Sequence, residues 1–159
     1  MSVSRSRDVL GLLSFVLLCF GAAAASELVT APAVPDWYEG LRKPPWTPPQ
    51  WVFGPVWTVL YALMAVAGWL AWREGRSRVA TLLFLLQLAL NAGWSWLFFG
   101  LRRPDLAFLG IAALFVAILA TIVAFARVSR GAAVLLVPYL AWVGFGSMLN
   151  WAIWRMNAG

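Results

Sequence analysis

Histidine is absent from this chain of 159 residues, and cysteine occurs once, as Cys19. A single cysteine excludes an internal disulfide, and without histidine no Cys/His metal site can form. Charged residues are also scarce, at 11% of the chain, whereas soluble domains have about a quarter. We therefore expect no metal site and a protein whose solvent is largely lipid.

Acidic side chains are expected only in or beside loops, with none in the middle of a membrane segment. The six acids are Asp8, Glu27, Asp36, Glu39, Glu74 and Asp105. Proton relays and ion-coupled transport need ionisable groups at membrane depth, so a pump is not expected. The chain also lacks a Ser–His–Asp set and a phosphate-binding loop, which excludes hydrolytic and phosphoryl-transfer chemistry.

Long apolar runs dominate what remains, because 63% of the residues are hydrophobic. Five segments reach the length of about 20 residues that a membrane-spanning helix needs. They cover approximately 9–29, 49–72, 79–101, 106–126 and 132–154. The sequence predicts an all-α membrane protein, a single domain over 1–159 built as a bundle of five transmembrane helices, with a lid loop at about 30–48.

The basic residues gather at the ends of these runs, although the net charge is +6. Such a distribution is typical of membrane-flanking anchors, so no nucleic-acid partner is expected. Seven basic residues on the side of the N-terminus, against five on the other, favour an N-terminus inside. The first segment has a second interpretation, because basic residues before an apolar run that ends in Ala22–Ser26 are also typical of a secretory signal.

The stretch KPPWTPPQWVFGPVWTVLY, residues 43–61, begins as a stiff proline-rich segment and continues into an apolar helix. Four prolines between 44 and 49 prevent a helix from starting before about Pro49. Phe53, Trp57 and Tyr61 then follow at intervals of four, which places three aromatic rings on one helix face.

Two other segments combine aromatic rings with uncharged amides on one face. In the third segment these residues are Gln87, Asn91, Trp94 and Phe98, and in the fifth they are Tyr139, Trp142, Gly146 and Asn150. One interpretation is that the amides hydrogen-bond across helices and hold the bundle together. The other is that the three faces line a pocket for a large flat apolar ligand, with Trp46 and Trp51 at its rim on the proline-rich lid.

Small residues indicate where helices approach closely. Ala89 and Gly93 form one patch, and the segment 110–124 carries a ridge of glycine and alanine at intervals of three and four. Because one patch can remain free for self-association, we expect a homodimer.

Several motifs together resemble the TspO/MBR family. They are Trp37-Tyr38, LRKPPWTPPQWVFGPVWTVLY (41–61), QLALNAGW (87–94), FFG (98–100), PYLAWVGF (138–145) and LN (149–150). The family comprises bacterial tryptophan-rich sensory proteins and the mitochondrial translocator protein, or peripheral benzodiazepine receptor. The resemblance implies five transmembrane helices, a retained first helix and homodimers, in a bacterial inner or outer membrane or, in a eukaryote, the mitochondrial outer membrane.

The resemblance also implies a ligand, protoporphyrin IX or haem, with no obligatory cofactor. The residues that it implies for the porphyrin and drug pocket are Trp46, Trp57, Tyr61, Asn91, Trp94, Trp142, Gly146 and Leu149. Without histidine, stacking rather than iron ligation would hold haem, which favours metal-free porphyrin. Sterol and benzodiazepine-type ligands are further family properties, but the sterol motif has Trp151 in place of tyrosine ahead of Arg155.

Three hypotheses for function follow. The first is a membrane receptor or carrier that regulates porphyrin handling or transport. The second is light-dependent porphyrin degradation, in which the family resemblance makes Trp57 and Trp142 the candidate catalytic residues. The third is a structural membrane protein that binds partners through its small-residue patches.

Overall fold

The computed structural model describes residues 2–159, and within them five helices are long and apolar enough to cross a membrane. The helices are α1 (Ser2–Asp36), α2 (Gln50–Gly75), α3 (Arg78–Ser95), α4 (Pro104–Ala126), α5 (Arg130–Leu135) and α6 (Val137–Asn157). Two short elements complete the chain, a 3-10 turn η1 (Tyr38–Gly40) and a π-helical turn η2 (Trp96–Gly100). The prediction of an all-α bundle with five spans is confirmed.

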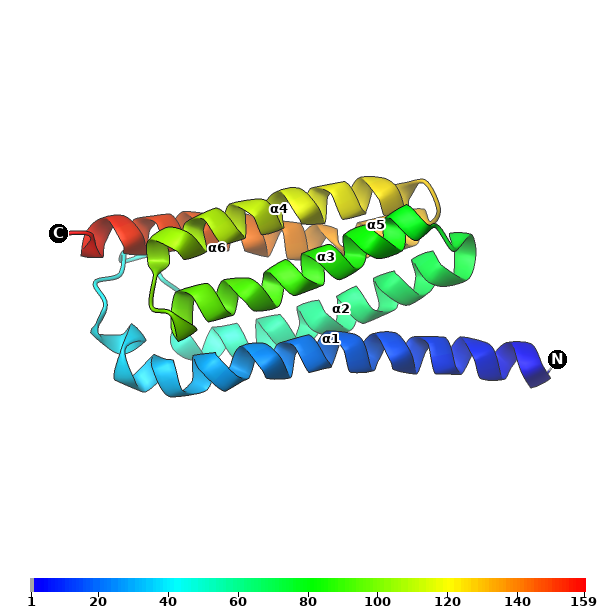
Figure 1. Ribbon diagram of the computed structural model, residues 1–159, viewed down its shortest axis with the longest axis horizontal. Helices are drawn as coiled ribbons and strands as arrows, with labels where there is room; N and C mark the ends of the chain where they lie inside the picture. Colours follow the sequence, from blue (N-terminus) through cyan, green and yellow to red (C-terminus); the bar gives the residue numbers. More distant parts are fainter. Residues whose placement is uncertain (1) are drawn as a thin grey trace.

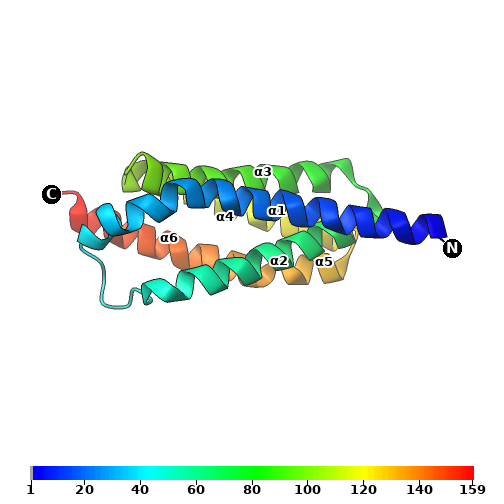
Figure 2. The ribbon, with the colours of Figure 1, turned by 90° about the horizontal axis from the view of Figure 1, so that it is seen from below.

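The spans form a closed ring in which each packs against its neighbours. Helix α1 packs on α2 and α3, α2 packs on α5, and α4 packs on α3, α5 and α6. The N-terminus lies at one end of the bundle, and the C-terminus and the long loop after α1 lie at the other (Figure 1). We call this second end the lid end. The same arrangement is visible from below, where α1 crosses the bundle over its full length (Figure 2).

The end of the first helix differs most from the sequence prediction. Helix α1 continues to Asp36 and contains Pro32 and Pro35, so the lid covers 37–49 and not 30–48. Each proline removes one backbone donor near the helix end, and membrane helices tolerate such losses because neighbouring groups satisfy the freed carbonyls. The third span ends in the π-helical turn, and the fifth is divided at Leu136, close to Pro138, which cannot donate the backbone bond of a continuous helix.

The two loops at the end of the bundle where the N-terminus lies are short, and the helices that follow them are capped. Arg76 adopts a left-handed conformation with φ 39° after α2, and the Ser77 hydroxyl accepts a hydrogen bond from the Ala80 amide at 3.3 Å. The Ser129 hydroxyl accepts in the same way from the Ala132 amide at 3.2 Å. Both serines are N-caps, which satisfy donors that would otherwise be unpaired in the first helical turn.

The small-residue patches have different surroundings. Ala117 on α4 is buried inside the bundle, whereas Ala89 is exposed and a Cβ at Gly93 would meet no atom within 4 Å. The patch of Ala89 and Gly93 therefore lies on the outer surface of α3. Ala113 of the α4 ridge is exposed as well, so both patches offer outer surface for the predicted self-association.

Substitution of Gly68 by alanine is expected to destabilise the half of the bundle away from the lid. A Cβ at this position would lie 2.7 Å from the Phe15 ring and 3.0 Å from the Phe84 ring. Both rings are packed, so the helices would have to move apart, at a cost of about 1–2 kcal/mol. Thermal unfolding in detergent measures the loss, and Gly21→Ala, where nothing lies within 4 Å, is the matched control. Equal stability of the two variants would contradict the packing.

Candidate functional site

A cavity of about 820 Å³ lies in the lid-end half of the bundle. Residues of α1, α2, α3, α4 and α6 line it, together with Tyr38 of η1 and two phenylalanines of η2. Its volume falls within the range of about 300–1,000 Å³ typical of small-molecule sites. The bundle therefore provides space for a ligand at the end where the lid lies.

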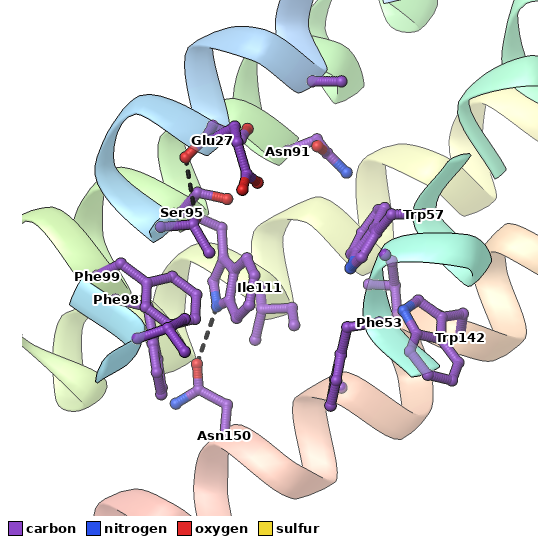
Figure 3. A pocket seen from close by; sticks show the side chains of 18 of the residues that line it. Glu27, Phe53, Trp57, Asn91, Ser95, Phe98, Phe99, Ile111, Trp142 and Asn150 are labelled. Atoms are coloured by element: carbon purple, nitrogen blue, oxygen red, sulfur yellow. Dashed lines mark hydrogen bonds between the residues drawn. The ribbon is translucent and has the colours of Figure 1, made fainter. Parts of the chain in front are cut away.

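Two groups of aromatic rings form opposite walls of this cavity (Figure 3). On α2 and α6, the Phe53 ring meets the Trp142 ring edge-on at 5.8 Å, and the Trp57 ring lies 5.6 Å from the Tyr61 ring. On the other wall, Trp94 packs 5.5 Å from Phe98, and Phe99 lies 4.8 Å from Phe98. A slot between aromatic walls is suited to a flat apolar molecule, which gains contact area and stacking on both faces.

A chain of buried hydrogen bonds lies at the inner end of the slot. The Tyr61 hydroxyl donates to Asn91 Oδ1 at 2.6 Å, and Asn91 Nδ2 donates to the Tyr139 hydroxyl at 2.8 Å. That hydroxyl in turn donates to Gln87 Oε1 at 2.9 Å, and Gln87 Nε2 lies 3.9 Å from the Met64 sulfur. The chain joins α2, α3 and α6, so the amides predicted from the sequence do hold helices together.

A second amide fixes the wall nearer the lid. Trp94 Nε1 donates to Asn150 Oδ1 at 2.9 Å, and Asn150 Nδ2 donates to the Pro104 carbonyl at 2.8 Å. These bonds join α3, α6 and the start of α4. They hold the indole of Trp94 in a defined orientation, so its face is available to the cavity.

The lid is fixed by its own polar contacts. The Lys43 ammonium donates to the carbonyls of Tyr38, Glu39 and Leu41 at 2.7, 3.2 and 3.0 Å, and lies 4.7 Å from the centre of the Tyr38 ring. Burial raises the pKa of the Tyr38 phenol above its usual range, so this side chain is neutral. The lid therefore presents an uncharged aromatic surface to the cavity.

The far end of the lid is held by α6. The Asn157 side chain accepts from the Arg42 amide at 3.1 Å and donates to the Arg42 carbonyl at 2.9 Å. Trp46 packs edge-on against Phe145 at 5.9 Å. The lid is thus connected to α6 both just before and within its proline-rich segment.

Most of the predicted ligand-binding residues line the cavity. They are Phe53, Trp57, Tyr61, Asn91, Trp94, Trp142, Gly146, Leu149 and Asn150. Three do not. Gln87 is fully buried beneath Asn91 and Tyr139, Trp46 covers Phe145 from outside, and Trp51 is 76% exposed at the start of α2. Trp151 and Arg155 of the predicted sterol motif are exposed residues of α6 and are not part of the lining.

Sequence reasoning missed the wall that α1 provides. Its lining residues are Phe20, Ala23, Ala24, Ser26, Glu27, Thr30, Ala31 and Val34. Their spacing of three and four is a helical face, but the apolar run is uniform enough that no face stands out. Glu27 in particular is a correction, because it was predicted in or beside a loop and lies within α1, nine residues before Asp36.

Metal binding has no support within residues 2–159, where no group of three or more His, Cys, Asp or Glu side chains comes together. The charged pairs of Arg102 with Asp36, at 2.6 Å, and of Arg103 with Asp105, at 2.5 Å, lie at the lid end. Both are accessible to solvent; the first joins the 101–103 loop to the end of α1, and the second lies at the start of α4. They belong to the surface and not to the cavity.

Fold and site together define a multi-pass integral membrane protein with an aromatic slot at one end of a five-span bundle. The chain belongs to the TspO/MBR family, whose pattern it matches over residues 15–155. It is 41% identical to the tryptophan-rich protein TspO of Chlorobaculum tepidum over 96% of this chain and 99% of that protein.

Two further relatives show how far the similarity extends. The translocator protein of Homo sapiens is 45% identical over 77% of this chain and 76% of its own length. The tryptophan-rich sensory protein of Cereibacter sphaeroides is 37% identical over 91% of this chain and 90% of its own length.

Proposed function

We propose that this protein is a membrane receptor or carrier for tetrapyrroles, with protoporphyrin IX as ligand, and that it regulates porphyrin handling or transport. The observation that carries the proposal is the slot between Trp57 and Trp142 on one side and Trp94 on the other, in a cavity of about 820 Å³. A porphyrin is flat, apolar over both faces and large, which matches the shape and the composition of these walls.

Two neutral polar groups of the site are compatible with the same ligand. Asn91 and Asn150 line the cavity as neutral amides, so they can meet the polar edge or centre of a ring without a buried charge. Family membership supports the proposal, since the resemblance implies porphyrin binding. Sterol binding through Trp151 and Arg155 has less support, because both lie outside the lining.

Replacement of Trp142 by alanine is expected to weaken protoporphyrin IX binding about tenfold, through loss of one stacking wall. Trp72→Ala is the control. Trp72 lies in the other half of α2, where its ring packs against Gly11 and under the Arg76 guanidinium at 5.1 Å. The Trp72→Ala variant should alter the packing of α1 on α2 without changing the affinity for protoporphyrin IX.

The measurement is a titration of the detergent-solubilised protein with protoporphyrin IX, followed by quenching of tryptophan fluorescence. Saturable quenching that Trp142→Ala weakens and Trp72→Ala leaves unchanged would support the proposal. Equal losses in both variants would contradict the assignment of the pocket. Linear, unsaturable quenching in all three proteins would mean that the porphyrin only partitions into the micelle.

A further inference from the structure

Glu27 places a carboxylate within a membrane-spanning helix. It precedes Asp36 at the end of α1 by nine residues, which at 1.5 Å per residue is roughly 13 Å along the axis. Helix α1 has 35 residues, or about 52 Å, and is longer than the hydrocarbon core of about 30 Å, so Glu27 lies within the candidate span but toward its lid end. Ionisable groups within a spanning helix are rare, and by default they indicate a functional site.

The cavity gives this carboxylate its surroundings. Glu27 lies in the middle of the helical face that lines the cavity, between Phe20 at one end and Val34 at the other. Of the lining residues within the described chain, it is the one with a formal charge. Figure 3 shows its side chain on the α1 side of the cavity, in the same region as Ser95.

No hydrogen bond or ion pair of the Glu27 carboxylate is found among the residues that the structure describes. Two other acids are paired, Asp36 with Arg102 and Asp105 with Arg103. These pairs are exposed at the lid end, where water could have hydrated the charges. Glu27 is itself exposed, in a helix that can span the membrane, and it has no partner from the described protein.

The neighbouring hydroxyls also present acceptors to the cavity. Ser26 Oγ donates its proton to the Ala22 carbonyl at 3.1 Å, and Thr30 Oγ1 donates to the Ser26 carbonyl at 2.9 Å. Their donors are used within α1, and the lone pairs of the oxygens remain. The α1 wall thus combines one carboxylate with two hydroxyl acceptors, which is the polarity that a cationic donor requires.

We propose that Glu27 forms an ammonium subsite, so that the pocket binds flat aromatic ligands bearing a protonated amine. The ring enters the aromatic slot and the ammonium donates to the Glu27 carboxylate and the hydroxyls of Ser26 and Thr30. This proposal rests on the proposed function in one respect, namely that a ligand binds in the same cavity. It also sets an orientation for acidic ligands, because the carboxylates of a porphyrin are repelled from the α1 wall.

The test uses three probes with one ring system, namely 1-pyrenemethylammonium, neutral 1-pyrenemethanol and anionic 1-pyrenecarboxylate. Each is titrated at neutral pH into the full chain in non-ionic detergent, with energy transfer from tryptophan to pyrene as the signal. The variant is Glu27→Gln, which keeps shape and removes charge. Glu74→Gln is the matched control, because Glu74 is an exposed acid near the end of α2, outside the cavity lining.

The wild type is expected to bind the ammonium about tenfold or more tightly than the alcohol, and the carboxylate most weakly. Glu27→Gln should abolish this preference, and Glu74→Gln should keep it. A wild type without the ranking, or a preference that survives in Glu27→Gln, would overturn the proposal, as would saturable binding by none of the probes. If the ammonium subsite fails this test, saturable protoporphyrin IX binding in the same preparations would still support the tetrapyrrole pocket. The ranking of the three probes is measured in the wild type, so it does not depend on whether a variant folds.

Discussion

Asn91→Ala is expected to lower the free energy of unfolding by about 2–4 kcal/mol. Asn91 is 2% exposed and holds two hydrogen bonds, one from the Tyr61 hydroxyl and one to the Tyr139 hydroxyl. Alanine removes both and leaves the Tyr61 hydroxyl without its acceptor in an apolar interior. It also leaves a void where three helices meet.

Single interhelical hydrogen bonds in membrane proteins contribute on average about 0.6 kcal/mol. The larger value expected here follows from the position of Asn91 inside the chain from Tyr61 to Gln87, where it has a partner on each side. Tyr139 keeps its bond to Gln87 Oε1 at 2.9 Å, so the remainder of the chain stays connected. The effect should therefore be local to α2 and its contact with α3.

Unfolding in mixed micelles of increasing SDS content, followed by circular dichroism, measures this loss. Gln50→Ala is the control, since Gln50 is an exposed amide in the first turn of α2 and should change stability by less than about 0.5 kcal/mol. If Asn91→Ala is as stable as Gln50→Ala, the hydrogen-bond chain does not stabilise the bundle, and the prediction is wrong.

Gly146→Phe is expected to weaken ligand binding on the order of a hundredfold, or about 3 kcal/mol. Gly146 lines the cavity from α6, and a Cβ there would lie 3.3 Å from Ile111 Cδ1. That contact is tight but involves the end of a flexible side chain. The phenyl ring would then extend into the slot and occupy the volume that a flat ligand needs.

Because the added ring enters empty space, the variant should remain folded while binding is lost. Gly21→Phe makes the same change on α1, where a Cβ would meet nothing within 4 Å, outside the cavity lining. Titration with protoporphyrin IX compares the two variants. Full affinity in Gly146→Phe would show that the ligand binds elsewhere, for example on the outer face of the bundle.

The spans, the aromatic faces and the family could be predicted from the sequence because they depend on local pattern. Membrane length needs only a count of apolar residues, and the interval of four between Phe53, Trp57 and Tyr61 places them together on any helix. The amides of α3 and α6 were found in the same way. Their use in cross-helix bonds followed from the absence of water in the bilayer.

The helix ends near proline could not be derived from local preference. The predicted span ends at 29 and the predicted loop begins at 30, whereas α1 continues through Pro32 and Pro35, even though the residue before a proline is biased away from helix. Whether a freed carbonyl finds a partner depends on the elements packed around it. That information is not present in the segment itself.

The prediction that Gln87, Trp46 and Trp51 bind the ligand shows the same limit, because it also depends on what packs around each residue. Gln87 shares a helix face with Asn91, but Tyr139 covers it and closes it off from the cavity, while the two tryptophans lie outside.

By itself, the sequence determined that this is a five-span membrane protein of the TspO/MBR family with aromatic and amide faces, since each property is carried by composition or helical spacing. Only the tertiary structure decided that the faces line one cavity, and that α1 adds a wall with Glu27 at its centre. The reason is physical. A helix face is fixed by its own residues, but what it faces depends on where the other helices pack.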